Sequence, residues 1–157
     1  MASIFDVAEY ALDKLHNTTE PKLEQLCFYC QAWSLVWDDK PLFGEDFEAW
    51  TCGPVCIELF ERTSGKFVLK AGDVKSEGHK FNSDERETMD AVLDYYGYKE
   101  PYRLREQACA EEPWKIARGS CEPWEACSTV IKKEDMKKYY ASLTDDDSQA
   151  QEETNHG

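Results

Sequence analysis

The stretch from Leu23 to Trp37 constrains the fold of this chain more than any other. Its apolar and small side chains recur every three or four residues, which is the spacing of one face of an α-helix. Thr19 can cap such a helix, and Pro21 is tolerated in its first turn. We therefore expect a long helix that runs to about Trp37 and packs one side against a core. That side comprises Leu23, Leu26, Cys27, Cys30, Trp33, Ser34 and Trp37.

Helical spacing also predicts two other capped helices. Near 3–15, Ser3 and Asp6 can form a variant of the capping box, in which two side chains satisfy the first amides of a helix. A second capped helix is expected to begin at Asn82 or Ser83, with Glu85 placed to reciprocate, and to end at Gly97.

Three less regular segments complete the expected helices. They lie near 101–111, as a short turn beginning at Pro113, and near 133–142.

Strand signals are confined to two short segments. Phe47 to Trp50 alternates as a strand does, and Gly53-Pro54 is expected to turn it into a helix that begins at Pro54. The run KFVLK at 66–70 is a second short strand candidate. We therefore predict a mostly α (α+β) fold, a compact helical domain over 1–143 with a small two- or three-stranded sheet.

The formal net charge is −14, and it limits the classes of partner. Residues 144–157 hold five acids and no Lys or Arg, which predicts a disordered acidic C-terminal tail. A surface of this sign repels nucleic acid phosphates and anionic lipid. We expect no direct nucleic acid binding and no membrane binding. A basic protein partner suits the charge, although solubility alone would also explain the tail.

The location expected from the sequence is the cytoplasm. No segment approaches the roughly 18 apolar residues that cross a membrane. The N-terminus, MASIFDVAEYALDKL, has acids where a signal peptide carries lysines. The seven cysteines are then expected to be reduced thiols.

Four of the cysteines could be explained in two ways, as core residues or as ligands of a zinc ion. Cys27 and Cys30 fall inside the long helix, where such residues usually act as small buried hydrophobes. With Cys52 and Cys56 they could instead supply four thiolates to zinc. The core interpretation is favoured, because both pairs fall within helical or near-helical segments, without the glycine pattern of a zinc knuckle.

The sequence contains little that indicates a catalytic site. A cysteine nucleophile such as Cys52 needs a base beside it, and the three histidines, His16, His79 and His156, lie far from it in sequence. Phosphate-binding and dinucleotide-binding fingerprints are missing from the sequence. We therefore expect no catalytic residue, no cofactor, and a protein that is not an enzyme.

Several motifs together resemble the Panacea domain, also called the SocA-like or GepA-like domain of phage-associated proteins. They are KLEQL at 22–26 with Tyr29, QAW at 31–33, KPLF at 40–43, EAW at 48–50, GPV at 53–55, Leu59 and EPWKIAR at 112–118. A closing helix from Ile131 to Tyr140 is also similar, so the resemblance spans about 3–142.

The resemblance implies a small, mostly helical antitoxin that neutralises a cognate toxin by direct binding, often on a phage or mobile element. Two other modes remain open at this point. One is a proteolytic adaptor that delivers the toxin to a ClpXP-type protease of the host. The other is an acidic phage protein that sequesters a host factor.

The partner-binding region cannot be carried over from the family. Aromatic side chains anchor interfaces and acids steer a basic partner, so the loop after the long helix is the candidate. The same aromatics, Trp50 above all, could equally belong to the core. The candidate residues are Trp37, Asp38, Asp39, Phe43, Glu45, Asp46 and Trp50.

Overall fold

The computed structural model describes residues 1–144 in full and residues 145–156 only as the course of the last helix. Its helices and strands follow one another along the chain as α1 (Ile4–Leu15), β1 (Asn17–Thr19), α2 (Glu20–Trp37), β2 (Glu48–Trp50), β3 (Gly53–Val55), α3 (Ile57–Arg62), β4 (Val68–Lys70), α4 (Ser83–Tyr96), α5 (Pro101–Ala110), α6 (Glu112–Arg118) and α7 (Lys133–His156). The predicted disordered tail, 144–157, lies almost wholly outside the residues described in full.

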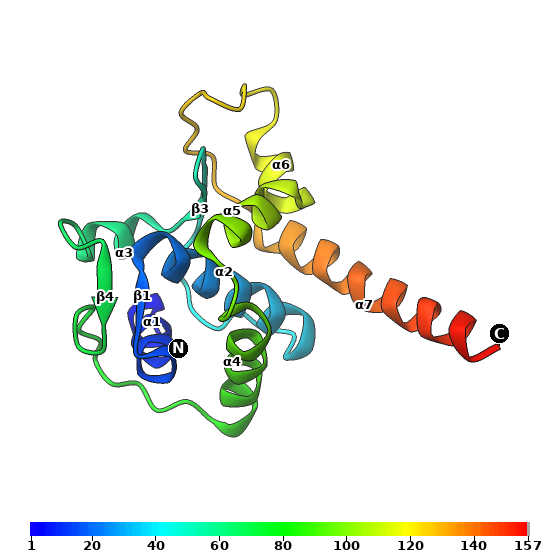
Figure 1. The fold of residues 1–157 in the computed structure, drawn as a ribbon, viewed down its shortest axis with the longest axis horizontal. Coiled ribbons are helices and arrows are strands. Elements are labelled where there is room, and N and C mark those ends of the chain that lie inside the picture. Colours follow the sequence, from blue (N-terminus) through cyan, green and yellow to red (C-terminus); the bar gives the residue numbers. More distant parts are fainter. Residues whose placement is uncertain (157) are drawn as a thin grey trace.

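Helix α2 is the centre of the fold. Figure 1 shows it surrounded by the other helices, and it contacts α1, α4, α5 and α7 as well as β3. The sequence predicts one buried side, but the structure buries the helix almost all round. Polar side chains of α2 are therefore taken into the interior, and they include Glu24, Gln25, Gln31 and Ser34.

Three predicted caps are confirmed. Ser3 and Asp6 form a capping box at α1, and Asn82 and Glu85 form another at α4. The hydroxyl of Thr19 accepts a hydrogen bond from the amide of Lys22 at the start of α2. Each cap joins residues three positions apart, so the sequence alone contains both partners.

The predicted small sheet is two separate antiparallel pairs. Strand β1 pairs with β4, and β2 pairs with β3 in a tight hairpin with Glu48 opposite Val55. Gly53-Pro54 was expected to turn a strand into a helix, and this expectation is wrong. Pro54 lies opposite Ala49 within the hairpin, and α3 begins only at Ile57.

The hairpin is held to the helical layer by later parts of the chain. The amide of Ala49 donates to the carbonyl of Thr129 at 2.9 Å, and that of Ile131 donates to Phe47 at 2.8 Å. In addition, Trp114 of α6 donates from Nε1 to the carbonyl of Trp50 at 2.9 Å. These bonds fix the position of the hairpin against α6 and the segment before α7.

The core beneath α2 is rich in aromatic rings. Tyr29 stacks on Tyr96 with ring centroids 4.0 Å apart, and Phe28 packs edge-on against Phe47 at 5.3 Å. The Tyr29 hydroxyl donates to the buried carboxyl of Glu111 at 2.7 Å, and that of Tyr140 donates to the same oxygen at 2.9 Å. Burying Glu111 is thus offset by two hydrogen bonds.

None of the helices that the structure describes is both long enough and apolar enough to cross a membrane.

Candidate protein-binding surface

Trp37 is the most exposed aromatic residue of α2 and forms its last residue. Its side chain is 49% exposed and stacks on Trp33 with centroids 4.8 Å apart. Trp33 is fixed in turn, because its Nε1 donates to the hydroxyl of Tyr96 at 3.1 Å. Trp37 is therefore held on a rigid aromatic base, and half of its surface remains free to contact a partner.

An aromatic groove lies beside Trp37, with a volume of about 380 Å³. Tyr95 of α4 forms an outer part of it and is 60% exposed. A groove of rings and aliphatic groups receives apolar or aromatic side chains, and Trp and Tyr are the residues that most often carry binding energy in such places. We call it the aromatic groove; its lining is Trp33, Trp37, Ala91, Val92, Tyr95, Tyr96, Gln107 and Leu143.

The two acids after Trp37 have partners within the fold. The Asp38 carboxylate accepts a hydrogen bond from Thr88 at 2.7 Å, which joins the end of α2 to α4. Asp39 is exposed and forms an ion pair with Lys137 of α7. The hydrogen bond from Lys137 lowers the pKa of Asp39. Both acids lie at the end of α2 that carries Trp37.

The rest of the predicted binding set does not form one surface. Phe43, expected in the exposed region, is fully buried in the core. The reason is Gln31, whose side chain accepts from the Phe43 amide and donates to its carbonyl, drawing the loop inward. Glu45 is half-buried and accepts from the Ile4 amide at 2.9 Å, and Asp46 pairs with Lys133 at 2.6 Å.

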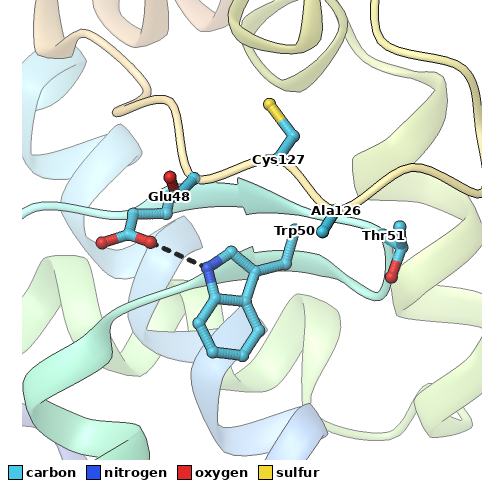
Figure 2. A pocket seen from close by; sticks show the side chains of 6 residues that line it. Glu48, Trp50, Thr51, Ala126 and Cys127 are labelled. Carbon is cyan, nitrogen blue, oxygen red and sulfur yellow. Dashed lines mark hydrogen bonds between the residues drawn. The ribbon is translucent and has the colours of Figure 1, made fainter.

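Trp50 belongs to the hairpin and not to the aromatic groove. Figure 2 shows its ring beside Glu48, whose carboxylate accepts a hydrogen bond from Trp50 Nε1 at 2.9 Å. The cavity drawn there has a volume of about 360 Å³ and is also lined by Ala126, Cys127 and Ser128. Of the residues that line it, the sequence analysis selected only Trp50.

Chemistry at the four cysteines of the alternative zinc set is disfavoured by their surroundings. Cys27 and Cys30 are buried and Cys52 is partly so, and burial raises the pKa of all three thiols. Cys56 is also buried, and its amide donates to Glu24. Among the described residues, no three His, Cys, Asp or Glu side chains are grouped so as to hold a metal ion. The alternative zinc set, Cys27, Cys30, Cys52 and Cys56, is therefore not assembled as one site.

Tyr95 was missed by the sequence analysis although a signal was present. The apolar stripe of α4 includes Val92, Leu93 and Tyr96. Tyr95 lies outside that stripe, so its aromatic ring is placed on the exposed side of the helix. An aromatic residue out of phase with a helix's buried face is a candidate for partner contact.

Comparison with known protein families finds a match over residues 23–115 to the Panacea domain of SocA-like antitoxins. The match covers more than half of the chain, from α2 into α6. It confirms the resemblance found in the sequence motifs. No curated protein and no solved structure matches the chain.

Proposed function

The chain belongs to the family of SocA-like antitoxins with a Panacea domain, and we propose from this that it neutralises a cognate toxin by direct protein–protein binding. On this proposal it acts stoichiometrically in the cytoplasm, is not an enzyme and needs no cofactor. Its gene would lie beside that of the toxin, on a phage or a mobile element.

The aromatic groove is the observation that carries direct binding. Trp37 of α2 and Tyr95 of α4 contribute large, ordered, half-exposed rings to its lining. Rings held by their own packing lose little conformational freedom on binding, so more of the contact energy appears as affinity. The groove would receive an apolar segment of the toxin.

The charge of the chain supports a basic toxin. With a formal net charge of −14, the protein attracts a positively charged partner over distances near the Debye length, about 8 Å at physiological salt. Such attraction mainly raises the association rate. The proposal therefore combines electrostatic attraction with anchoring by aromatic residues.

Co-expression with the product of the neighbouring gene tests the proposal. We expect growth to be restored and the two proteins to co-purify in a fixed ratio. The toxin level must stay constant while growth is restored, because a proteolytic adaptor would instead shorten the toxin's half-life in cells that contain the protease. No rescue, or rescue only with falling toxin levels, would contradict neutralisation by direct binding.

A further inference from the structure

A small pocket lies where the start of α2 meets the β2–β3 hairpin and α3, and it contains buried carboxyl oxygens to which the described fold supplies no donor. Glu24 is 1% exposed. Its Oε2 accepts a hydrogen bond from the Cys56 amide at 2.9 Å, whereas its Oε1 has no donor. A buried oxygen without a donor is unfavourable, so a ligand that supplied a donor there would be stabilised.

Two neighbouring side chains also have a buried oxygen without a hydrogen-bond donor. Oε1 of Glu20 and Oε1 of Gln25 are buried and lack a donor, and both side chains line the same pocket as Glu24. The carboxyls of Glu20 and Glu24 lie within hydrogen-bonding reach of each other, and burial raises the pKa of both. Two carboxyls so placed share one proton when no other cation is present, and this proton is then the donor that no other group of the fold supplies.

The outer walls of the pocket are aromatic. Trp50 of β2 and Phe60 of α3 meet with centroids 5.2 Å apart at 63°, and Phe60 is 41% exposed. The Trp50 ring is held by its bond to Glu48. Faces of aromatic rings attract cations. The pocket thus has carboxyl groups at its base and rings at its mouth; its lining is Glu20, Pro21, Glu24, Gln25, Trp50, Cys52, Pro54, Val55 and Phe60.

We propose that this pocket binds the primary ammonium group of a lysine side chain on a partner protein, with Glu20 and Glu24 as counter-charges and Trp50 and Phe60 around the lysine stem. The inference rests on the proposed function only in naming the partner as the toxin. On binding, the ammonium replaces the proton shared by the two carboxyls, and that proton passes to solvent.

The size of the pocket favours an ammonium group over a guanidinium group. Its volume is about 30 Å³, and a cavity of roughly 10–15 Å³ already holds a water molecule, which an ammonium resembles in size. A planar guanidinium group is wider. Among the described residues, no three acidic, thiol or imidazole side chains are grouped so as to hold a metal ion, and the thiol of Cys52 in this lining does not complete such a group. Aromatic walls suit an organic cation and offer no ligand to a metal.

The other titratable and charged groups near the pair leave the site negative. Glu58 of α3 is acidic, and the thiols of Cys27, Cys52 and Cys56 have pKa values raised by burial. Arg105 of α5 is the cation that acts on Cys52. It is exposed and does not line the pocket.

A short peptide, acetyl-Gly-Lys-Gly-amide, probes the pocket in the full-length protein. We expect saturable shifts of the Trp50 indole resonance in NMR spectra, assigned with Trp50→Phe. The same peptide with an acetylated lysine side chain should cause none. Glu24→Gln and Glu20→Gln should each weaken binding of the lysine peptide about tenfold or more, since each removes a charged partner of the ammonium.

The matched control is Glu61→Gln, which removes an exposed charge of α3 that does not line the pocket. It should bind the lysine peptide as the wild type does. Glu24→Gln keeps an oxygen for the Cys56 amide, and unchanged far-UV and near-UV spectra will show that it folds. Equal binding of the acetylated peptide, unchanged binding by both Gln variants, or the same shifts with Mg²⁺ or Ca²⁺ alone would overturn the proposal.

Failure of this inference and failure of the proposed function give different results. If the toxin is neutralised but the lysine peptide causes no shift, the pocket proposal is wrong and the antitoxin proposal stands. If the peptide binds through Glu24 but no neighbouring gene product is neutralised, the pocket binds lysine and the antitoxin proposal is wrong.

Discussion

Nη1 of Arg118 donates to the carbonyl oxygen of Ala49 at 3.0 Å, which joins α6 to the β2–β3 hairpin. Nη2 of the same side chain donates to the carbonyls of Glu122 at 2.5 Å and Glu125 at 2.8 Å. Arg118 is only 4% exposed. One guanidinium thus fixes the hairpin and the loop after α6 in a single arrangement.

Replacing Arg118 by Ala should lower the free energy of unfolding by about 2–3 kcal/mol, because carbonyl groups lose their donor in a buried place. Arg118→Lys should recover only part of this, since an ammonium lacks the planar fork of donors. Urea denaturation measures both. Arg103→Ala, at an exposed arginine of α5, is the control and should stay within about 0.5 kcal/mol of the wild type. Equal stability of all three variants would contradict the structural role.

The buried Glu24 predicts an unusual dependence of stability on pH. Burial raises the pKa of its carboxyl well above the ordinary value of 4.5. Above about pH 4.5 the unfolded chain releases this proton while the folded protein keeps it, so the free energy of unfolding falls as pH rises. Glu20, whose pKa is also raised, contributes in the same direction.

Glu24→Gln removes the titrating group, so its free energy of unfolding should fall less than that of the wild type between about pH 5 and pH 8. Denaturation curves at several pH values measure this. Glu61→Gln should give a curve parallel to the wild type. If Glu24→Gln were also parallel, Glu24 would be ionised in the folded protein.

The sequence predicts features whose partners are close along the chain. The caps at Ser3, Thr19 and Asn82 each depend on a residue three positions away, and all three are confirmed. Features that depend on distant partners could not be predicted. Strand β1 was not predicted, because its three residues form a strand only by pairing with β4.

The same distinction explains the candidate sites. Trp37 was selected because an aromatic residue at a helix end is visible in the sequence. Glu24 and Gln25 were missed because a helix with one apolar stripe should expose them, whereas helices and strands on several sides of α2 bury them. Phe43 was misplaced because the bonds from Gln31 that turn it inward have no local signal.

Gly53 lies where a strand-to-helix turn was expected and a hairpin is found, and its backbone conformation gives a further prediction. Its φ of +111° is a conformation that glycine adopts readily and other residues rarely do. A Cβ there would lie 3.2 Å from Nε2 of Gln25. Gly53→Ala should therefore destabilise the protein by about 1–3 kcal/mol.

Gly72→Ala is the matched control for this substitution. Gly72 has a φ of +92°, and a Cβ there would meet nothing within 4 Å. It carries the backbone strain without the contact, so it should cost less than Gly53→Ala in the same thermal or urea unfolding experiment. Equal losses would mean that the approach of Gln25 to the hairpin has no energetic consequence.

The aromatic groove makes the most direct prediction about function. Trp37→Ala should weaken binding to the toxin by about 2 kcal/mol, close to 30-fold, because it removes an ordered ring from the centre of the proposed contact. Tyr95→Ala should act in the same direction, because Tyr95 also lines the groove. Isothermal titration of the purified toxin measures both affinities, and unfolding curves separate lost binding from lost stability.

Tyr98→Ala is the control, since Tyr98 is 75% exposed and does not line the groove. Its affinity should match that of the wild type within about threefold. A loss at Tyr98 as large as the loss at Trp37 would show that exposed aromatic area in general drives binding. No loss at Trp37 and Tyr95, in variants that fold normally and still neutralise the toxin, would place the toxin on another surface of the fold.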